Sequence, residues 1–234
     1  MRRGVLACIV ACLLAPLPAR AAVAVPLLPG LRDRLVVIDP GHGGVDPGAV
    51  GHGYRESTIN IAVSRIVAED LRALGVRTWL THGGPMGGQN AAGAELNPDR
   101  RLNLRLRTAE ANRLRPDCFL SIHVNHFSGA RARGSQVFID KCADESSQRL
   151  AEYLTQHLRA VTGSRRQVSR SINHYLLKHV AVPRATVELG FISNPAEANL
   201  LASPTYERRL AHAVAIAVLQ FLSDHPQVQH SLGS

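Results

Sequence analysis

The stretch Arg34–Gly44, RLVVIDPGHGG, joins a short apolar run to a glycine-rich turn. Arg34–Asp39 is dominated by β-branched residues and is stopped by Pro40-Gly41, which is typical of a buried strand. The next segment, Glu56–Leu74, carries its apolar residues on one helical face and ends at a glycine, so it predicts an amphipathic helix. Val76–Thr81 is again apolar and predicts a second strand.

The remainder of the chain continues this alternation. We expect strands at Phe119–Val124, Ser135–Asp140 and Thr186–Leu189, helices at Pro98–Leu114, from Glu145 to about Val161 and from Ser203-Pro204 onward, a surface segment at Arg165–Ser171, and a short strand or helical turn at Tyr175–Lys178. The glycine-rich stretch His82–Asn97 is expected to be a loop. Strands that alternate with helices predict a single-domain α/β layered fold with a mostly parallel mixed sheet and helices on both faces.

One helix of this series carries many arginines. In Pro98–Leu114 we expect Leu102, Leu106, Ala109 and Leu114 to face the core and the arginines to face solvent. The last helix is expected to bury its apolar stripe, which runs from Leu210 to Phe221.

The composition excludes several classes of protein. The chain has 234 residues, of which 45% are hydrophobic and 19% charged, so it is too apolar for a disordered protein. The formal net charge is +9, and nearly all basic residues are arginines, which favours anionic partners. The arginines are scattered and no nucleic-acid-binding signature is present, so we expect no nucleic-acid partner.

The N-terminus predicts export. Residues 1–21 combine two arginines, a short apolar run and Ala19-Arg20-Ala21, which is the pattern of a cleaved signal peptide. A buried N-terminal helix is the alternative, but this run has no amphipathic face. A lipoprotein-type signal ending at Cys12 is only faintly suggested, because that cysteine lies early behind a short apolar stretch. We therefore expect a signal at 1–21, a leader at 22–34, a catalytic domain at 35–224 and a polar tail at 225–234, with no membrane span after cleavage.

Two cysteines remain after the signal, Cys118 and Cys142, and an exported protein allows them to pair. If the strands at 119–124 and 136–140 were antiparallel neighbours with 124 opposite 136, the two cysteines would be opposite each other. The sequence therefore leaves two possibilities, a structural disulfide or two separate buried thiols.

Four residues capable of metal or acid–base chemistry lie at or near the expected strand ends. His42 follows the first strand, His123 ends the third, Glu188 lies in a late strand, and Glu56 opens the first helix. His42 alone could be a turn residue, His123 a core histidine, and Glu56 a carboxylate favoured by the helix dipole. Glu188 is hardest to explain in this way, because its apolar neighbours imply burial and a buried carboxylate needs a partner.

Taken together, these residues predict a hydrolytic metal site. The carboxyl ends of parallel strands meet at one edge of a sheet, where α/β proteins place their sites. Two histidines and one carboxylate with an open position for water form a catalytic zinc site, and a further carboxylate can act as its general base. A phosphate-binding loop is the weaker interpretation, since the glycine-rich turn lacks the lysine of a P-loop.

The same segments resemble a known family. VVIDPGHGGVDPGAVG at 36–51, Glu56 in YRESTINIA, SIHVN at 121–125 and VELGFISN at 187–194 are similar to the zinc-dependent N-acetylmuramoyl-L-alanine amidases of the Amidase_3 family. Arg107 and Asn112 in LRLRTAEAN also match the helix motif of this family. The resemblance covers roughly residues 35–222.

The resemblance implies roles for individual residues. His42, Glu56 and His123 are expected to bind Zn²⁺, and Glu188 is expected to be the catalytic glutamate. The implied reaction is hydrolysis of the amide between the lactyl group of N-acetylmuramic acid and L-alanine of the peptidoglycan stem peptide. Further residues that we expect to contact substrate or support the site are Asn125, His126, Arg107 and Asn194.

The resemblance also bears on partners and location. Peptidoglycan is the expected substrate, and a protein activator is possible but unidentified. We expect a monomer, and the signal peptide together with the lack of wall-binding repeats predicts a periplasmic location. Segment 141–174 is too short for the full inhibitory helix that many periplasmic relatives insert there, and the leader is too short for their wall-targeting domain. The alternatives are a zinc peptidase or deacetylase acting on another wall bond, or a catalytically silent wall-binding module.

Overall fold

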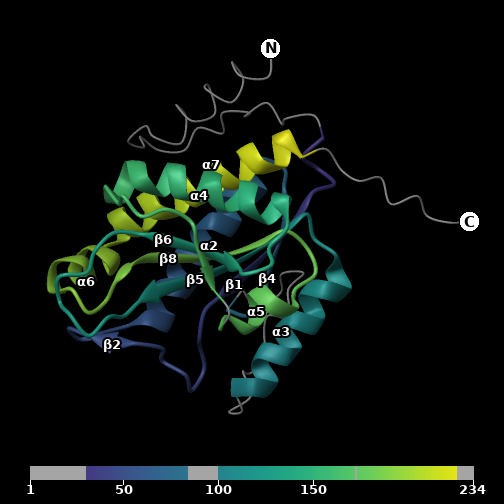
Figure 1. Cartoon of the computed structure of the whole chain (residues 1–234). Helices are drawn as coiled ribbons and strands as arrows, with labels where there is room; N and C mark the ends of the chain where they lie inside the picture. Colours follow the sequence, from purple (N-terminus) through teal and green to yellow (C-terminus); the bar gives the residue numbers. More distant parts are fainter. Residues whose placement is uncertain (1–29, 84–99, 172, 226–234) are drawn as a thin grey trace, which may run out of the picture.

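The computed structural model describes residues 30–83, 100–171 and 173–225, and its core is one six-stranded sheet (Figure 1). In spatial order its strands are β4 (Arg77–Leu80), β1 (Leu35–Pro40), β5 (Cys118–Asn125), β8 (Arg184–Phe191), β6 (Gln136–Asp140) and β7 (Ser169–Ser171). The predicted signal peptide at 1–21, most of the leader, most of the glycine-rich loop and most of the tail lie outside the described residues.

The sheet is mixed and mostly parallel, as predicted. β1 runs parallel to β4 and β5, and β5 runs parallel to β8. Only the pairing of β6 with β8 is antiparallel, and β7 is parallel to β6. The adjacent strands β1, β5 and β8 therefore end at the same edge, where the candidate residues were expected.

Helices cover both faces of the sheet (Figure 1). α2 (Glu56–Ala73), α4 (Glu145–Thr162) and α7 (Pro204–Asp224) lie on one face, while α3 (Arg100–Leu114) and α5 (Tyr175–His179) lie on the other. A short helix that sequence analysis did not predict, α6 (Pro195–Leu201), follows β8, and a small hairpin of β2 (Val50–Gly51) and β3 (Tyr54–Arg55) precedes α2. Among the described residues, no helix is long and apolar enough to cross a membrane.

Alternating strand residues separate the two cores. Val36 and Ile38 of β1 pack with α2, α4 and α7 in the larger core, whereas Val37 points to the smaller core beneath α3 and α5. The apolar stripe of α7 between Leu210 and Phe221 is buried, as its periodicity predicted. Asp39 lies two residues after Val37, so its side chain points to the same face of the sheet. The end of β1 therefore presents a carboxylate toward α3.

The predicted inward face of α3 was wrong. Leu106 is 56% exposed and Ala109 is also exposed, whereas Leu114 is half-buried and the side chain of Leu102 is outside the described part. The buried face instead contains Asn103, Arg107, Thr108 and Ala111. The side of α3 that faces inward is determined by polar contacts with the end of β1, which are described below. The spacing of apolar residues along the helix cannot reveal such contacts.

The structure also excludes the predicted pairing of the cysteine-flanked strands. β8 lies between β5 and β6, so these two strands are not neighbours and the assumed register does not exist. Cys118 is fully buried, Cys142 is exposed, and both are free thiols. The segment expected to lie on the surface, 165–171, contributes the edge strand β7 (Ser169–Ser171) at its end.

The two thiols are expected to differ in reactivity. In a chain that starts at residue 22, a thiol reagent should modify one cysteine under native conditions, Cys142, because Cys118 is buried and burial raises the pKa of its thiol. Unfolding should expose the second. Mass spectrometry of the labelled chain checks this, and a native chain with no reactive thiol would instead indicate a disulfide.

Candidate metal centre

His42 lies in a turn that glycine makes possible. The residue itself has a φ of 63°, and Gly43 and Gly44 that follow also have positive φ values. Gly41, directly before it, donates its N–H to the carbonyl oxygen of Ile122, which ties the turn to β5. A Cβ atom at position 41 would lie 2.3 Å from the ring of His123, so only glycine leaves room for this imidazole.

Glu56 is the first residue of α2, and its buried carboxylate is held from several sides. The backbone N–H of Ala49 donates to Oε2 at 2.8 Å, and that of Val124 donates to Oε1 at 3.1 Å. Burial by itself would raise the pKa of Glu56, but hydrogen bonding and the positive charges of His123 and His42 hold it far below its usual value. Glu56 is therefore ionised at neutral pH.

The three side chains converge on one point. His123 Nδ1 lies 2.9 Å from Glu56 Oε1, and His42 Nε2 lies 3.3 Å from the same oxygen. The ligand atoms of His42, Glu56 and His123 all lie within 4.8 Å of one another. Two imidazoles and one ionised carboxylate are a donor set suited to a divalent transition metal, and Zn²⁺ takes such ligands in catalytic sites. The residues therefore fit the predicted metal.

Glu188 lies beside this cluster because of strand register. It is the Cα partner of His123 in the β5–β8 pairing, so their side chains lie next to each other on one face of the sheet. Its Oε2 is buried and has no hydrogen-bond partner among the described residues. Burial raises the pKa of Glu188 to about 7; the nearby His123 and His42 lower it and Glu56 raises it. A carboxyl group with this pKa can both accept and release a proton at neutral pH.

Asp46 orients His42, and sequence analysis did not find it. Asp46 Oδ2 lies 2.9 Å from His42 Nδ1, while its Oδ1 accepts the backbone N–H of Gly48 at 3.1 Å. Arg100 Nε, at the start of α3, lies 3.3 Å from the same Oδ2. This contact keeps a proton on Nδ1 of His42, so Nε2 is the nitrogen that can give up its proton and offer a lone pair to a metal. The only hint in the sequence was that Asp46 follows His42 by four residues within the same turn.

Arg107 supports the same turn from α3. Its Nη2 donates to the carbonyl oxygen of His42 at 2.7 Å, and its Nη1 lies 3.3 Å from both the carbonyl oxygen of Pro40 and Asp39 Oδ1. Asp39 is fully buried and also accepts hydrogen bonds from the hydroxyl groups of Thr81 and Ser121. Arg107, predicted to contact substrate or support the site, forms its contacts with the protein backbone and Asp39.

The other predicted residues are more peripheral. Asn125 ends β5 and accepts the N–H of Ile192 through its backbone oxygen, and His126 is exposed directly after it. Asn194 caps α6, because its side chain accepts the N–H groups of Ala196 and Glu197. Capping accounts for the side chain of Asn194 without any substrate.

A small pocket opens beside the cluster. Its volume is about 50 Å³, and His42, His123, Arg100, Arg107 and Leu176 are among the residues that line it. The pocket lies between the His42 turn and the helices α3 and α5, so a group bound there would be next to two of the three candidate ligands.

Comparison with known proteins identifies the family of this chain. The Amidase_3 family, described as N-acetylmuramoyl-L-alanine amidase, matches residues 36–220. The uncharacterized protein YqiI of Bacillus subtilis is 34% identical, over 79% of this chain and 82% of its own length. The germination-specific N-acetylmuramoyl-L-alanine amidase of the same organism is 29% identical, over 83% of this chain and 82% of its own length.

A solved structure shows the same architecture. The CwlD amidase of Clostridioides difficile, determined in complex with the GerS lipoprotein, has a TM-score of 0.74 and 29% sequence identity, covering 82% of this chain and 100% of that one. The family match spans well over half of the sequence and includes every strand and helix that contributes to the cluster. The chain therefore belongs to the Amidase_3 family of N-acetylmuramoyl-L-alanine amidases.

Proposed function

We propose that the protein is an exported zinc hydrolase that cleaves the amide between the lactyl group of N-acetylmuramic acid and L-alanine of the peptidoglycan stem peptide. Family membership supports the reaction. The observation that carries the mechanism is the buried, unpartnered Oε2 of Glu188 beside the cluster of His42, Glu56 and His123. No structural need of the fold explains a lone buried carboxyl at that position.

In this proposal His42, Glu56 and His123 hold the zinc ion. When bound, zinc supplies a Lewis acid that polarises the scissile carbonyl and makes a water molecule more acidic. The low pKa of Glu56 keeps this ligand ionised, and the contact with Asp46 keeps Nε2 of His42 available.

Glu188 moves the proton. Its carboxylate takes a proton from the attacking water, holds it, and passes it to the nitrogen of L-alanine as the amide bond breaks. In the metal-free chain, burial raises the pKa of this carboxyl group to about 7. Strand β8 fixes the position of this side chain, because β8 is hydrogen-bonded to a neighbouring strand on each side.

Export and location follow from the N-terminal sequence and the substrate. Residues 1–21 serve as the signal, 22–34 as a leader, 35–224 as the catalytic domain and 225–234 as a polar tail. We place the enzyme in a periplasm, acting as a monomer on peptidoglycan. The CwlD amidase is solved with a lipoprotein, which supports testing whether this enzyme also needs an activator.

The reaction can be tested with a chain of residues 22–234 and intact peptidoglycan. We expect soluble stem peptides that begin with L-alanine, lost with a chelator and restored by zinc, as read by mass spectrometry. Acetate release or cleavage within the stem would indicate a deacetylase or a peptidase. A zinc-loaded protein that binds peptidoglycan but releases nothing, even with candidate activators, would indicate a silent binding module.

Asp46→Ala is expected to weaken zinc binding by about 10- to 100-fold, because His42 loses the partner that fixes its ring and its proton. Competition with a coloured chelator measures the affinity. Glu69→Ala removes an exposed carboxylate of α2 and is the matched control, expected to bind zinc like the unchanged protein. Equal affinities for both variants would contradict the role of Asp46.

A further inference from the structure

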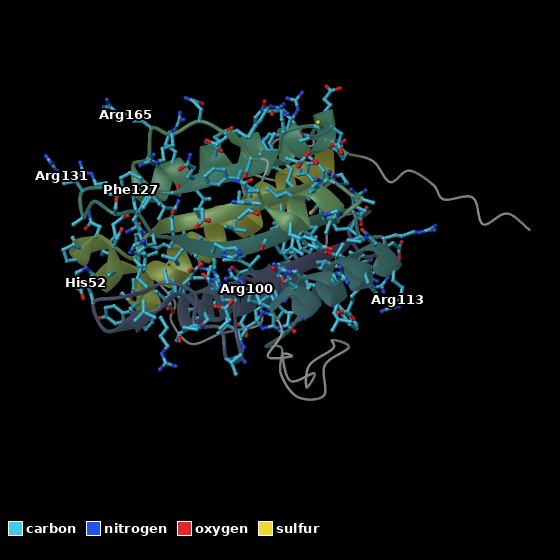
Figure 2. The ribbon with its side chains drawn as sticks, turned by 60° about the horizontal axis from the view of Figure 1, so that its bottom comes forward. His52, Arg100, Arg113, Phe127, Arg131 and Arg165 are labelled. Carbon is cyan, nitrogen blue, oxygen red and sulfur yellow. The ribbon has the colours of Figure 1, made fainter. Side chains whose placement is uncertain are left out.

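Two loops beside the candidate site carry a group of exposed arginines. Loop 126–135 leads from the end of β5 to the start of β6, and loop 163–168 leads from α4 to β7. They carry Arg131, Arg133, Arg165 and Arg166, which we call the arginine rim and which are all exposed. In Figure 2, Arg131 and Arg165 project from the same edge of the molecule as Phe127.

The arginine rim adjoins Glu188. Gln136, the first residue of β6, is the Cα partner of Glu188 in the antiparallel pairing of β6 with β8. The loop that carries Arg131 and Arg133 ends directly before this pair, so it leaves the sheet at the edge where the cluster lies. A substrate whose scissile amide is at Glu188 can therefore extend its stem toward the rim, whose Arg166 packs on Phe191 three residues after Glu188.

The two loops are joined to each other and to the end of β8. Ser164 Oγ donates to the carbonyl oxygen of Ser135 at 2.7 Å, and the guanidinium carbon of Arg166 lies 5.0 Å from the centre of the Phe191 ring. Glu197 accepts the backbone N–H of Gly134 at 2.8 Å and that of Phe191 at 2.9 Å. Four arginines are thus held on well-anchored loops.

The positive charge of the rim is not neutralised locally. None of the four arginines forms a salt bridge with a carboxylate among the described residues. Glu197 is the acidic group whose charge reaches Arg133 and Arg166, and both of its oxygens already accept backbone hydrogen bonds. The rim therefore carries an excess of positive charge available to an external anion.

We infer that the arginine rim binds free carboxylates of the stem peptide, next to the amide that is cut. Arginine pairs carboxylates through two parallel hydrogen bonds, and stem residues beyond L-alanine carry such groups. Phe127, which is 60% exposed and whose N–H donates to Ser193 Oγ, offers an apolar surface beside them. This inference rests on the proposed function, and it makes the enzyme selective for stems whose carboxylates are not amidated.

The test compares two substrates and three proteins. The substrates are native peptidoglycan and the same material with its carboxylates amidated by carbodiimide and ammonia. The proteins are the unchanged chain, R131Q/R133Q/R165Q, and the control R77Q/R105Q/R113Q, which removes three exposed arginines from β4 and α3. Arg166 is left unchanged because it packs on Phe191.

On native peptidoglycan we expect R131Q/R133Q/R165Q to raise KM about tenfold with kcat unchanged. This factor corresponds to the loss of three exposed ion pairs with the substrate, each of which contributes modestly to binding. Amidation should raise KM of the unchanged chain by a similar factor and leave that of the rim variant unaltered. The control should behave like the unchanged chain throughout. An unaltered KM in the rim variant, or equal effects of the rim substitutions on both substrates, would overturn the inference.

A binding measurement tests the inference about the rim independently of the proposed reaction. Co-sedimentation with the two peptidoglycans at low salt should show the same pattern, since screening weakens such contacts only at higher ionic strength. The result could be that none of the three proteins releases stem peptides while the rim variant alone loses binding to native peptidoglycan. In that case the proposed reaction would be wrong, but the inference that the arginine rim binds carboxylates would be correct. Equal thermal midpoints of the three proteins confirm that all are folded.

Discussion

Glu188→Gln is expected to lower kcat by about a thousandfold, within the usual range for loss of a general base and acid. The amide fills the same space next to His123 but cannot take up and release the proton. Initial rates of stem-peptide release with zinc-loaded protein measure the loss. Glu152→Gln, an exposed change on α4, is the control and should keep full activity. A Glu188→Gln enzyme with the kcat of the unchanged chain would contradict the proposed mechanism.

Stability provides a second readout for Glu188. Its pKa is raised by burial to about 7, so without metal the folded chain holds this proton more tightly than the unfolded chain does. Stability is therefore lost as pH rises from the unfolded pKa, about 4.5, toward 7. Glu188→Gln should remove this contribution, so that the metal-free variant is at least as stable as the unchanged chain at pH 8. Denaturant unfolding at pH 5 and pH 8 checks the difference.

Arg107→Met is expected to reduce the free energy of unfolding by about 3–5 kcal/mol, the usual cost of removing one partner from a buried ion pair. The variant leaves Asp39 buried without its counter-charge and removes the Nη2 donor to the carbonyl oxygen of His42, while the carbonyl oxygen of Pro40 keeps its contact with His82 Nε2. Urea unfolding with a shared m-value measures the change. Arg105→Met, on the exposed side of the same helix, should change stability by less than about 0.5 kcal/mol.

The pH dependence identifies the cause of that loss. Burial by itself would raise the pKa of Asp39, but Arg107, His82 and two hydroxyl groups hold it below its usual value. Its contribution to stability is present above the unfolded pKa and disappears as pH falls. Without Arg107 the buried charge is unfavourable, so the deficit of the variant should be largest at neutral pH and shrink in acid. Adding Asp39→Asn to Arg107→Met should recover part of the loss, and no recovery would contradict a charge-based cause.

Much of the fold was predictable because its signals are local. The apolar run before Pro40, the amphipathic pattern of α2 and the glycine that ends it depend only on neighbouring residues, and the structure confirms all three. Because the carboxyl ends of parallel strands meet at one edge of a sheet, the sequence also predicted that His42, His123 and Glu188 lie close together. The parallel pairing of β1, β5 and β8 confirms this.

The failures concern contacts between distant segments. The inward face of α3 is chosen by the pairing of Arg107 with Asp39, two polar residues 68 positions apart, so an apolar pattern selects the wrong side. The disulfide prediction assumed that β6 pairs with β5, whereas β8, more than forty residues later in the chain, takes that place. Asp46 acts through one hydrogen bond within a turn, which leaves no periodic signal.

The position of β8 has a consequence for the order in which activity can appear. All three candidate metal ligands precede residue 124, but β8 begins at Arg184 and lies between strands that are made earlier. A chain still emerging, or cut before that residue, therefore contains the three candidate ligands yet lacks both Glu188, the proposed proton acceptor, and the strand that joins the two halves of the sheet. Such long-range pairing is a late step in folding. Under the proposed mechanism, a chain cut before Arg184 is therefore inactive even though it contains all three candidate metal ligands.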